Sequence, residues 1–356
     1  MRPEPLSLPD NARIAIVRLS ALGDVSLMLP TIHSILQRYP KAKITWIIGR
    51  SAYSLLAGLP GVEFIVIDKP NSVSDYWRFR QQLHDREFDV LLAMQASLRA
   101  NLLYPFIRAK RKIGYDNQRA KDGQRWFIDE SIPFAPEHLL DSFFAFAKTI
   151  GVMEKVLRWE IPIDETTQNW ATSLLTDLPR PLLVVNPAAS KPERTWRSER
   201  YIEVIRAAQQ RWHAHVILTG GNSDVEKTIG VTIQSAIGNN ITNLIGQTSP
   251  KQLAALLQQC HCLLAPDTGP AHIANAMGTP VVSLFAVAPP QLSAPYLHQD
   301  LVVNRFPDAV RELLKQDPAN ITWGTRVHDS AAMDLISVDE VMGKLALVLV
   351  LDRCVQ

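Results

Sequence analysis

Short runs of aliphatic residues alternate with helical patterns along the first half of the chain. Residues 13–17 (RIAIV) predict a first strand, and residues 29–39 carry apolar side chains at the spacing of an amphipathic helix. Further apolar runs at residues 44–48, 64–67 and 90–94 have the length and aliphatic content of buried parallel strands. This alternation predicts a doubly wound α/β sheet.

A polar stretch at residues 164–177 interrupts the pattern, and a second alternation follows it. The strands predicted there are residues 182–185, 215–218, 241–245, 262–265 and 281–285. The helices predicted there are residues 198–212, 223–237, 249–259 and 269–277, of which the first three have serine at a favourable N-cap position. We therefore expect two Rossmann-like domains with parallel sheets facing a cleft, at residues 1–165 and 166–335. Residues 336–356 predict a final helix that could cross back to the first domain.

Composition agrees with a two-domain globular protein. A chain of 356 residues is too long for one ordinary core, and its 47% hydrophobic and 20% charged content excludes extensive disorder. The formal net charge of +2 does not by itself indicate nucleic acid, which we do not expect as a partner. The N-terminal residues include Pro and Glu where a signal peptide needs an apolar core, and no apolar run approaches a membrane span. We expect a cytoplasmic protein, with peripheral contact to the inner membrane left open.

Three cysteines, Cys260, Cys262 and Cys354, indicate reduced thiols rather than a disulfide framework. Cys260-His261-Cys262 could be half of a metal site, but no second Cys/His cluster accompanies it. We predict buried structural thiols, because cysteine is among the most buried residue types, and we predict no metal site.

The first candidate for chemistry is the segment R-L-S-A-L-G-D after the first predicted strand. Loops at the carboxyl ends of central strands bind ligands in open α/β sheets. Gly23 allows a tight turn there, and Asp24 opens the following helix. Asp24 is either a helix cap or a general base, and the residues alone leave both readings open. The segment is not a G-x-G-x-x-G fingerprint, so we expect no nicotinamide cofactor.

A second candidate is A-P-D-T-G-P-A-H, between a predicted strand and a helix rich in small residues. Asp267 and Thr268 precede helix amides that are suited to phosphate, and Gly269 allows close approach. A carboxylate aimed at a phosphate would repel it, so Asp267 is more plausible as a loop-orienting group or a partner of a sugar hydroxyl. His272, one turn into the helix, could face the ligand. A purely structural cap is the alternative.

Two more polar loops follow strands in the second half. Ser190, Lys191 and Arg194 could neutralise a diphosphate leaving group, although a solvated surface loop is the alternative. The turn T-G-G-N-S-D places Asp224 where it could accept hydrogen bonds from ribose hydroxyls, but such turns are common. All of these loops lie at one edge of one predicted sheet. A phosphate-binding lobe opposite a lobe carrying Asp24 is what glycosyl transfer between two substrates needs.

The same segments resemble the ADP-heptose:lipopolysaccharide heptosyltransferases, and the resemblance covers nearly the whole chain. It rests on R-L-S-A-L-G-D-V, L-T-G-G-x-x-D and L-I-G-Q-T-S-P-K-Q-L-A-A-L-L-Q-Q-C, and above all on A-P-D-T-G-P-A-H-I-A-N-A-M-G-T-P-V-V-S-L-F. The resemblance implies a GT-B fold and a metal-independent, inverting transfer of heptose from ADP-heptose to the lipopolysaccharide inner core. The nucleotide sugar would be a substrate, and no cofactor is implied.

The resemblance also implies residue roles. Asp24 would be the catalytic base on the acceptor hydroxyl, and Arg194 would lie near the donor diphosphate. The remaining matches to the donor-binding positions of the family are Asp224, Asp267, Thr268, Gly269 and His272.

The acceptor implied by the resemblance is an anionic, lipid-linked core sugar, and a basic segment fits it. Between residues 99 and 125, eight positive residues face only two negative ones, an excess of six. Such a segment could attract a phosphorylated lipid or an anionic membrane, or simply be solvated. The resemblance points to Arg99, Arg119 and Lys121 as acceptor contacts.

Several positions depart from the family pattern. Leu27 stands where His is frequent, and residues 186–189 (Asn-Pro-Ala-Ala) replace His-Pro-Gly-Ala. Residues 93–95 (Ala-Met-Gln) replace an Asp-x-Gln-like element, and residues 286–288 (Ala-Val-Ala) replace Gly-x-Thr. These changes leave open which core position, sugar and base are used. Two alternatives also remain: a nucleotide-sugar epimerase of the same fold, and a catalytically silent relative that binds a nucleotide sugar or a lipid.

Overall fold

The computed structural model describes residues 7–68, 70 and 72–350. The chain divides into two compact units, Met1–Pro162 and Ile163–Gln356. This division falls three residues before the predicted boundary between residues 165 and 166.

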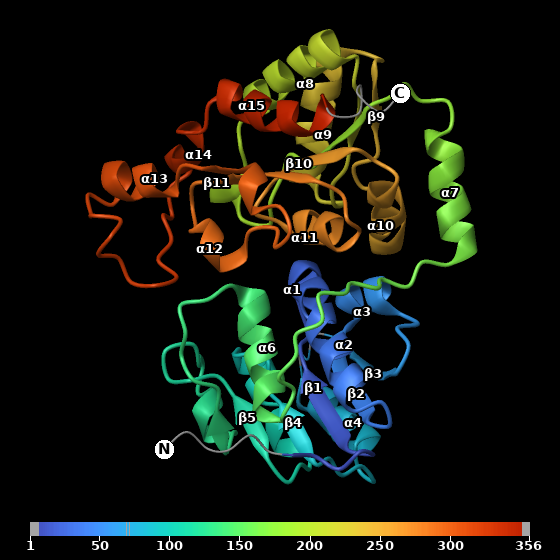
Figure 1. Cartoon of the computed structure of the whole chain (residues 1–356), viewed down its shortest axis with the longest axis vertical. Helices are drawn as coiled ribbons and strands as arrows, with labels where there is room; N and C mark the ends of the chain where they lie inside the picture. Colours follow the sequence, from blue (N-terminus) through green and yellow to red (C-terminus); the bar gives the residue numbers. More distant parts are fainter. Residues whose placement is uncertain (1–6, 69, 71, 351–356) are drawn as a thin grey trace. The chain divides into compact units, whose positions relative to one another are not determined.

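The first unit is built on a six-stranded sheet in the order β3-β2-β1-β4-β5-β6, in which all neighbouring strands are parallel (Figure 1). Its strands are β1 (Arg13–Val17), β2 (Lys43–Gly49), β3 (Val62–Ile67), β4 (Val90–Leu92), β5 (Lys112–Gly114) and β6 (Glu130–Ser131). Its helices are α1 (Leu22–Leu27), α2 (Leu29–Arg38), α3 (Arg50–Leu56), α4 (Val73–Gln82), α5 (Leu98–Asn101) and α6 (Leu139–Thr149), with short 3₁₀ turns η1 (Tyr104–Phe106) and η2 (Gln124–Trp126).

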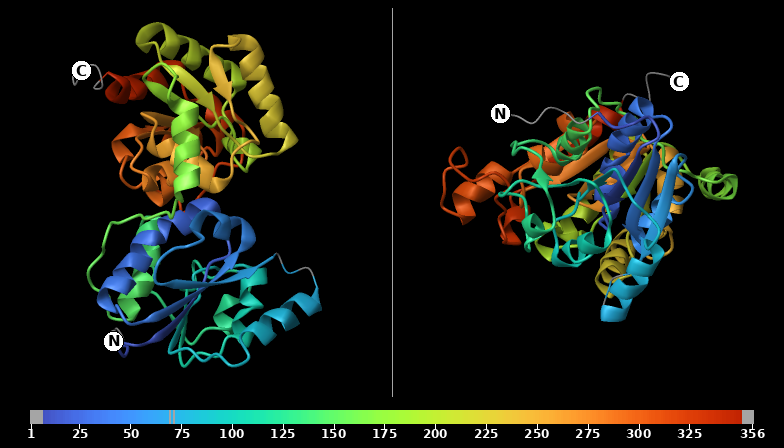
Figure 2. Two further views of the ribbon diagram at one scale, coloured as in Figure 1. Left: turned by 90° about the vertical axis from the view of Figure 1, so that its right-hand side faces the viewer. Right: turned by 90° about the horizontal axis from the view of Figure 1, so that it is seen from below.

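Both faces of this sheet are covered, which explains the buried aliphatic runs of its central strands β1 and β4. Ala15 and Val17 of β1 pack in one core with Phe79 of α4. Ile14 and Ile16 alternate to the opposite face and are fully buried. Figure 2 shows α2 and α6 on one side of the sheet and α4 on the other.

The second unit repeats the architecture with the order β12-β11-β10-β7-β8-β9, again parallel throughout. Its strands are β7 (Leu182–Val185), β8 (His215–Leu218), β9 (Ile241–Asn243), β10 (Cys262–Pro266), β11 (Val281–Phe285) and β12 (Val302–Asn304). Its helices are α7 (Glu165–Leu175), α8 (Ser198–Trp212), α9 (Asp224–Ile237), α10 (Pro250–Gln258), α11 (Gly269–Ala276), α12 (Pro290–Ser293), α13 (Phe306–Leu313), α14 (Ala331–Asp334) and α15 (Val338–Leu349), with 3₁₀ turns η3 (Pro192–Arg194) and η4 (Gln299–Leu301).

Two of the three predicted serine caps are confirmed. The Oγ of Ser223 accepts the amide of Glu226 at the start of α9, and the Oγ of Ser249 accepts the amide of Gln252 at the start of α10. Ser198 is instead the first residue inside α8, because the chain already turns into the helix after Arg197.

The strand order decides where ligands can bind. Counted within each unit, both orders read 3-2-1-4-5-6, the arrangement of a doubly wound nucleotide-binding sheet. The direction of winding reverses between β1 and β4 in the first unit and between β7 and β10 in the second. The loops that follow these strands diverge there and leave a crevice at the carboxyl edge of each sheet.

The last helix, α15, belongs to the second unit rather than crossing back to the first. Its apolar side chains Val341, Leu345 and Leu349 are part of the second hydrophobic core, and in Figure 1 it lies beside α8. The physical reason is its amphipathic spacing, because one apolar stripe fits the face that α8 and the sheet leave uncovered. Residues 351–356, which complete the predicted segment, lie outside the described residues.

Replacing Leu345 by Ala should therefore destabilise the second unit. The side chain is fully buried, and a buried Leu→Ala change costs about 2–5 kcal/mol of unfolding free energy. Leu347→Ala is the matched control on the same helix, since Leu347 is 54% exposed and its loss should cost less than about 0.5 kcal/mol. Urea denaturation of the full chain measures both, and equal losses would contradict the packing of α15.

Candidate active site

Asp24 lies in the first turn of α1, at the carboxyl end of β1. It is the third residue of the helix rather than its N-cap, which is Ala21. One carboxylate oxygen accepts the amide of Ala21 at 3.0 Å, so the group does stabilise the helix start. Its side chain is still 26% exposed. Capping and a role toward a ligand are therefore compatible in this position.

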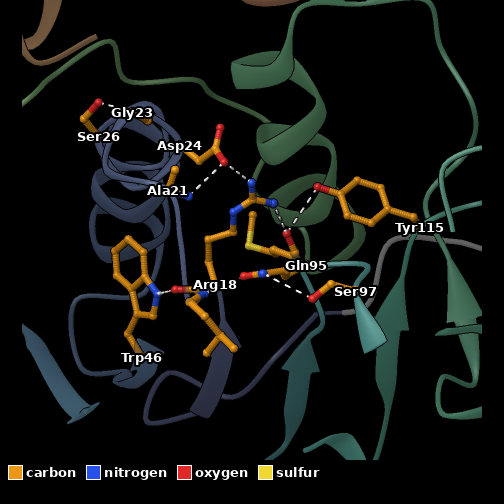
Figure 3. Close-up of polar contacts among 11 residues, drawn as sticks. Arg18, Ala21, Gly23, Asp24, Ser26, Trp46, Gln95, Ser97 and Tyr115 are labelled. Atoms are coloured by element: carbon orange, nitrogen blue, oxygen red, sulfur yellow. Dashed lines mark hydrogen bonds and ion pairs between the residues drawn. The ribbon is translucent and has the colours of Figure 1, made fainter. Parts of the chain in front are cut away.

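Arg18 holds the same carboxylate. Its guanidinium forms an ion pair with Asp24 and donates a second hydrogen bond to the carbonyl of Met94 at 2.8 Å (Figure 3). It also lies 5.2 Å from the centre of the Phe143 ring. Burial alone would lower the pKa of Arg18, but the charge of Asp24 and its hydrogen bond raise it above the ordinary value. The guanidinium is thus a permanent positive charge that orients Asp24.

Gln95 joins the loop after β1 to the loop after β4. Its side-chain oxygen accepts the amide of Leu19 at 2.6 Å, and its amide nitrogen donates to Ser97 Oγ at 3.3 Å. On the other side, Trp46 Nε1 donates to the carbonyl of Arg18 at 3.1 Å. Figure 3 shows these groups surrounding the backbone that carries Asp24. The loop is fixed from both neighbouring strands.

Close backbone packing tightens this loop further. The amide of Gly49, at the end of β2, donates to the carbonyl of Leu19 at 3.0 Å. A Cβ at Gly49 would lie 2.5 Å from that carbonyl oxygen, so only glycine fits without a shift.

A further layer of polar side chains supports the loop after β4. Gln124 donates to the carbonyls of Ala93 at 2.9 Å and Gln95 at 3.1 Å. Tyr115 donates to the carbonyl of Met94 at 3.3 Å, and burial raises the pKa of its hydroxyl to about 12. The phenol therefore stays protonated and keeps its donor near neutral pH.

A pocket of about 780 Å³ lies beside the Asp24 loop, within the first unit. It is lined by residues at the carboxyl ends of the central strands and by the start of α5: Leu19, Ser20, Gly49, Arg50, Ser51, Ile67, Asp68, Pro70, Gln95, Ser97, Leu98 and Arg99. Its size suits a small-molecule ligand.

The predicted acceptor contacts differ in their surroundings. Arg99 is exposed and lines this pocket, and Lys121 is exposed. Arg119 is not available in the same way. Its three guanidinium nitrogens are hydrogen-bonded to Asp116, Ser142 and the carbonyl of Pro133, and its side chain is only 18% exposed. Arg119 holds its own loop together, and its contact with the acceptor stays a prediction.

The basic segment also carries less free charge than its sequence indicated. Lys110 pairs with Asp89 at 2.7 Å and Arg111 pairs with Glu130, carboxylates that lie outside the segment. Lys112 donates to a backbone carbonyl, and burial lowers its pKa. The sequence count could not include Asp89 and Glu130, because both lie outside the segment and are brought to it by the fold.

In the second unit, one ion pair spans the point where the winding reverses. Arg194, in η3 after β7, contacts Asp267, directly after β10, at 3.0 Å. Both side chains are largely buried, at 16% and 12% exposure. Ser293 Oγ donates to the other carboxylate oxygen at 3.4 Å. Asp267 is thus held and neutralised by Arg194, while its predicted role in the donor site stays a prediction.

The start of α11 lies next to this ion pair. Thr268 is the N-cap residue, and its hydroxyl makes no capping hydrogen bond. Pro270 has no amide hydrogen, and the Ala271 amide donates to the Thr268 carbonyl at 3.2 Å, which leaves the Gly269 amide as a donor at the helix start. His272 is buried one turn further along. The arrangement can bind an anion at the helix N-terminus, beside the guanidinium of Arg194.

The remaining predicted donor residues lie on the surface. Ser190 and Lys191 are exposed in the loop after β7, and Asp224 is exposed at the first position of α9. The neighbouring Glu226 accepts the amide of Gly221 at 2.8 Å and the Ser223 hydroxyl, so it caps its helix. The Asp224 carboxylate takes no part in this cap.

Sequence reasoning missed the roles of Arg18 and Gln95. Both stood inside quoted segments, but neither was assigned a function. A signal for Arg18 was present, because an arginine six residues before an aspartate at a strand-to-helix loop can fold back on it. Gln95 had no local signal, since its partner Leu19 lies 76 residues away.

Cys260 and Cys262 are buried, as predicted, and burial raises the pKa of each thiol to about 12. Cys354 lies outside the described residues. Within the described part of the chain, His, Cys, Asp and Glu side chains do not gather into a group that could hold a metal ion.

Comparison with known proteins assigns the chain to a family. A family model described as glycosyltransferase family 9 (heptosyltransferase) matches residues 76–320. The chain belongs to glycosyltransferase family 9. The family recognised from the sequence and its α/β fold of two Rossmann-like units are thereby confirmed.

Relatives extend the likeness over the whole chain. The lipopolysaccharide core heptosyltransferase OpsX of Haemophilus influenzae is 35% identical over 343 residues, covering 96% of this chain and 98% of the relative. The family 9 crystal structure from Veillonella parvula has a TM-score of 0.76 at 20% identity, with 95% and 97% coverage. Escherichia coli heptosyltransferase WaaC with ADP has a TM-score of 0.68 at 18% identity, with 94% and 98% coverage. Among the described residues of this family 9 member, no helix is both long and apolar enough to cross a bilayer.

Replacing Arg18 by Met in this glycosyltransferase should destabilise the first unit by about 1–3 kcal/mol, because Asp24 and the Met94 carbonyl both lose a largely buried donor. Arg50→Met is the matched control. Arg50 also pairs with a carboxylate, Asp68, but both side chains are more than two-thirds exposed, at 69% and 68%. Its loss should cost less than about 1 kcal/mol. Chemical denaturation compares the two variants, and an equal or smaller effect at Arg18 would contradict its structural role.

Proposed function

We propose that this chain transfers a heptose from ADP-heptose to an anionic, lipid-linked sugar of the lipopolysaccharide inner core, with inversion at the anomeric carbon. The observation that carries the proposal is the 35% identity, over 96% of the chain, to a relative named as a lipopolysaccharide core heptosyltransferase. The structure of a more distant relative with ADP supports adenine as the base of the donor.

In this proposal the first unit binds the acceptor and Asp24 is the general base. The carboxylate is partly exposed at the switch point of its sheet, and the pocket beside it can hold a sugar. Asp24 takes the proton of the acceptor hydroxyl as that oxygen bonds to the anomeric carbon. Arg18 positions the carboxylate through their ion pair. The proton thus ends on Asp24, and the new glycosidic bond forms on the acceptor oxygen.

The second unit binds the donor through its diphosphate. As the bond from the anomeric carbon to the phosphate oxygen breaks, its electron pair leaves with ADP. The added negative charge is met by Arg194 and by the Gly269 amide at the start of α11. Attack opposite the leaving group gives inversion. Because these groups supply the positive charge, the proposed step requires no metal ion, and activity should persist in EDTA.

A lipid-linked acceptor would determine where the enzyme works in the cell. We propose that the enzyme works in the cytoplasm at the surface of the inner membrane, where its acceptor is embedded.

Asp24→Asn should lower the rate of transfer roughly 100- to 10,000-fold, the usual contribution of a general base. The Asn oxygen can still accept the Ala21 amide, so the helix start and ADP binding should be retained. Transfer to core acceptors is measured by mass spectrometry and ADP binding by calorimetry. Asp85→Asn is the control, because this carboxylate of the same unit is 93% exposed and should not affect the rate.

Normal turnover of Asp24→Asn would remove this residue from the mechanism. The same assay tests the alternatives. Epimerised sugar formed from donor alone would favour the epimerase, and donor binding without turnover on any core acceptor would favour a silent relative.

Arg194→Ala should weaken donor binding and slow transfer together, by about 100-fold or more in kcat/KM. Asp267 would lose its partner and present an uncompensated charge to the diphosphate. The double variant R194A/D267N separates two roles, since it should recover only the part of the loss that this repulsion causes. Full recovery would mean that Arg194 acts solely by neutralising Asp267. Arg197→Ala is the control, because Arg197 pairs with Asp334 and is 65% exposed.

A further inference from the structure

We propose that the first unit docks on an anionic lipid bilayer through one defined surface beside its pocket. This surface, here named the α5–η2 surface, consists of three apolar and three basic side chains: Leu98, Arg99, Leu102, Lys121, Arg125 and Trp126. The inference deepens the proposed function and rests on it for the identity of the acceptor, but the docking itself is measured without any transfer reaction.

Hydrogen bonds bring the two segments of this surface together. The amide of Leu98, at the start of α5, donates to Asp122 at 2.9 Å. The side chain of Asn101 donates to the carbonyls of Lys121 and Asp122, each at 2.9 Å. α5 therefore lies directly against the loop that leads into η2.

Trp126 is attached to the same loop. Gly123 has a left-handed φ of 78°, and a Cβ on it would lie 2.6 Å from the Trp126 ring. The indole thus covers the turn between Asp122 and η2, on the loop that α5 contacts. The apolar and basic side chains consequently belong to one continuous surface.

The three apolar side chains of this surface are strongly exposed to solvent. Trp126 is 74% exposed, Leu98 58% and Leu102 40%. Leu98 and Leu102 are one helical turn apart, so they face the same way. Tryptophan favours the membrane–water interface, where its ring lies among lipid headgroups and its N–H remains hydrated. An exposed indole next to two leucines fits that environment.

The three basic side chains of this surface provide positive charge that complements an anionic bilayer. Arg99, Lys121 and Arg125 are exposed, and within the part of the chain that the structure describes none of them forms an ion pair. Asp122 is the one acid among them, and its carboxylate already accepts the Leu98 amide. Each basic residue near an anionic bilayer strengthens binding roughly fivefold. Basic residues alone would also suit a nucleic acid, but the exposed leucines favour lipid.

The position of the surface connects it with the pocket. Leu98 and Arg99 belong both to the α5–η2 surface and to the pocket lining, which also includes Ser20 of the Asp24 loop. Docking through this surface would hold the pocket mouth at the headgroup level. A lipid-linked sugar could then enter the pocket while its acyl chains remain in the bilayer.

Vesicle co-sedimentation of the full chain tests the proposal. Wild-type protein should bind vesicles of phosphatidylcholine mixed with phosphatidylglycerol, should bind phosphatidylcholine alone much more weakly, and should release with salt. The double variant W126S/L102S should weaken binding to the mixed vesicles about tenfold, and R125Q should weaken it roughly fivefold with a smaller salt dependence. Absence of binding to the anionic vesicles would overturn the proposal.

Matched variants control for folding and for a general effect of charge. Val225→Ser removes a side chain that is 69% exposed on α9 of the second unit. Lys41→Gln removes an exposed charge that precedes β2, at the amino end of that strand. Both should bind like the wild type. If W126S/L102S and R125Q also bound like the wild type, the contact would lie on another surface and the proposal would be wrong.

Transfer assays then separate docking from catalysis. With a soluble, delipidated acceptor, W126S/L102S should retain wild-type turnover, because neither residue lines the pocket. With the same acceptor sugar anchored in anionic vesicles, its turnover should fall about tenfold. Loss of both activities would place these residues in the reaction rather than in docking and would contradict the inference. Inactive wild-type protein that still binds anionic vesicles would instead contradict the proposed function alone.

Discussion

The reversal of strand order at the middle of each parallel sheet is the constraint on which both candidate sites depend. Loops after β1 and β4, and after β7 and β10, turn to opposite sides and leave their backbones without a regular partner at the carboxyl edge. In the first unit side chains fill this role, since Gln95 binds the backbone of the β1 loop and Arg18 spans from Asp24 to the β4 loop. In the second unit the ion pair of Arg194 and Asp267 joins the two loops directly. Each unit thus places a guanidinium–carboxylate pair where its fold leaves a crevice.

The two pairs are suited to different chemical roles because their surroundings differ. In the first unit the carboxylate is the more exposed partner, at 26% against 13% for Arg18, which suits the general base that we propose, with the cation as its support. In the second unit both partners are largely buried, at 16% and 12% exposure, beside the N-terminus of α11, and a helix N-terminus favours an anion. Transfer of a sugar from a diphosphate requires one group that accepts a proton and another that stabilises a departing anion. In the proposed mechanism one ion pair provides the proton acceptor, Asp24, and the other provides the cation near the departing anion, Arg194.

Much of the fold was predictable, because strands that are buried on both faces appear in the sequence as short aliphatic runs. Strands such as β1, β7 and β11 have the predicted bounds, and the loops that follow them could be placed at one edge from topology alone. What could not be predicted were contacts between distant segments. Gln95 and Leu19 are an example, and so is Arg119, whose guanidinium is occupied by its own unit. The final helix shows the same limit, since an amphipathic stripe predicts that a face is buried but not which core it joins.

The structure shows which of the basic residues between positions 99 and 125 remain free and where they lie. Of its eight cations, four are held by their own unit, through carboxylates or backbone carbonyls; these are Lys110, Arg111, Lys112 and Arg119. Arg108 is exposed elsewhere, beside Glu87 and Asp89. The other three gather around α5 and η2 together with the most exposed tryptophan of the first unit. Internal contacts therefore occupy half of the cations, and three of the remaining four lie around α5 and η2, beside the pocket. The apolar and basic side chains of the α5–η2 surface are all exposed, and they suit the anionic bilayer on which we propose that the first unit docks.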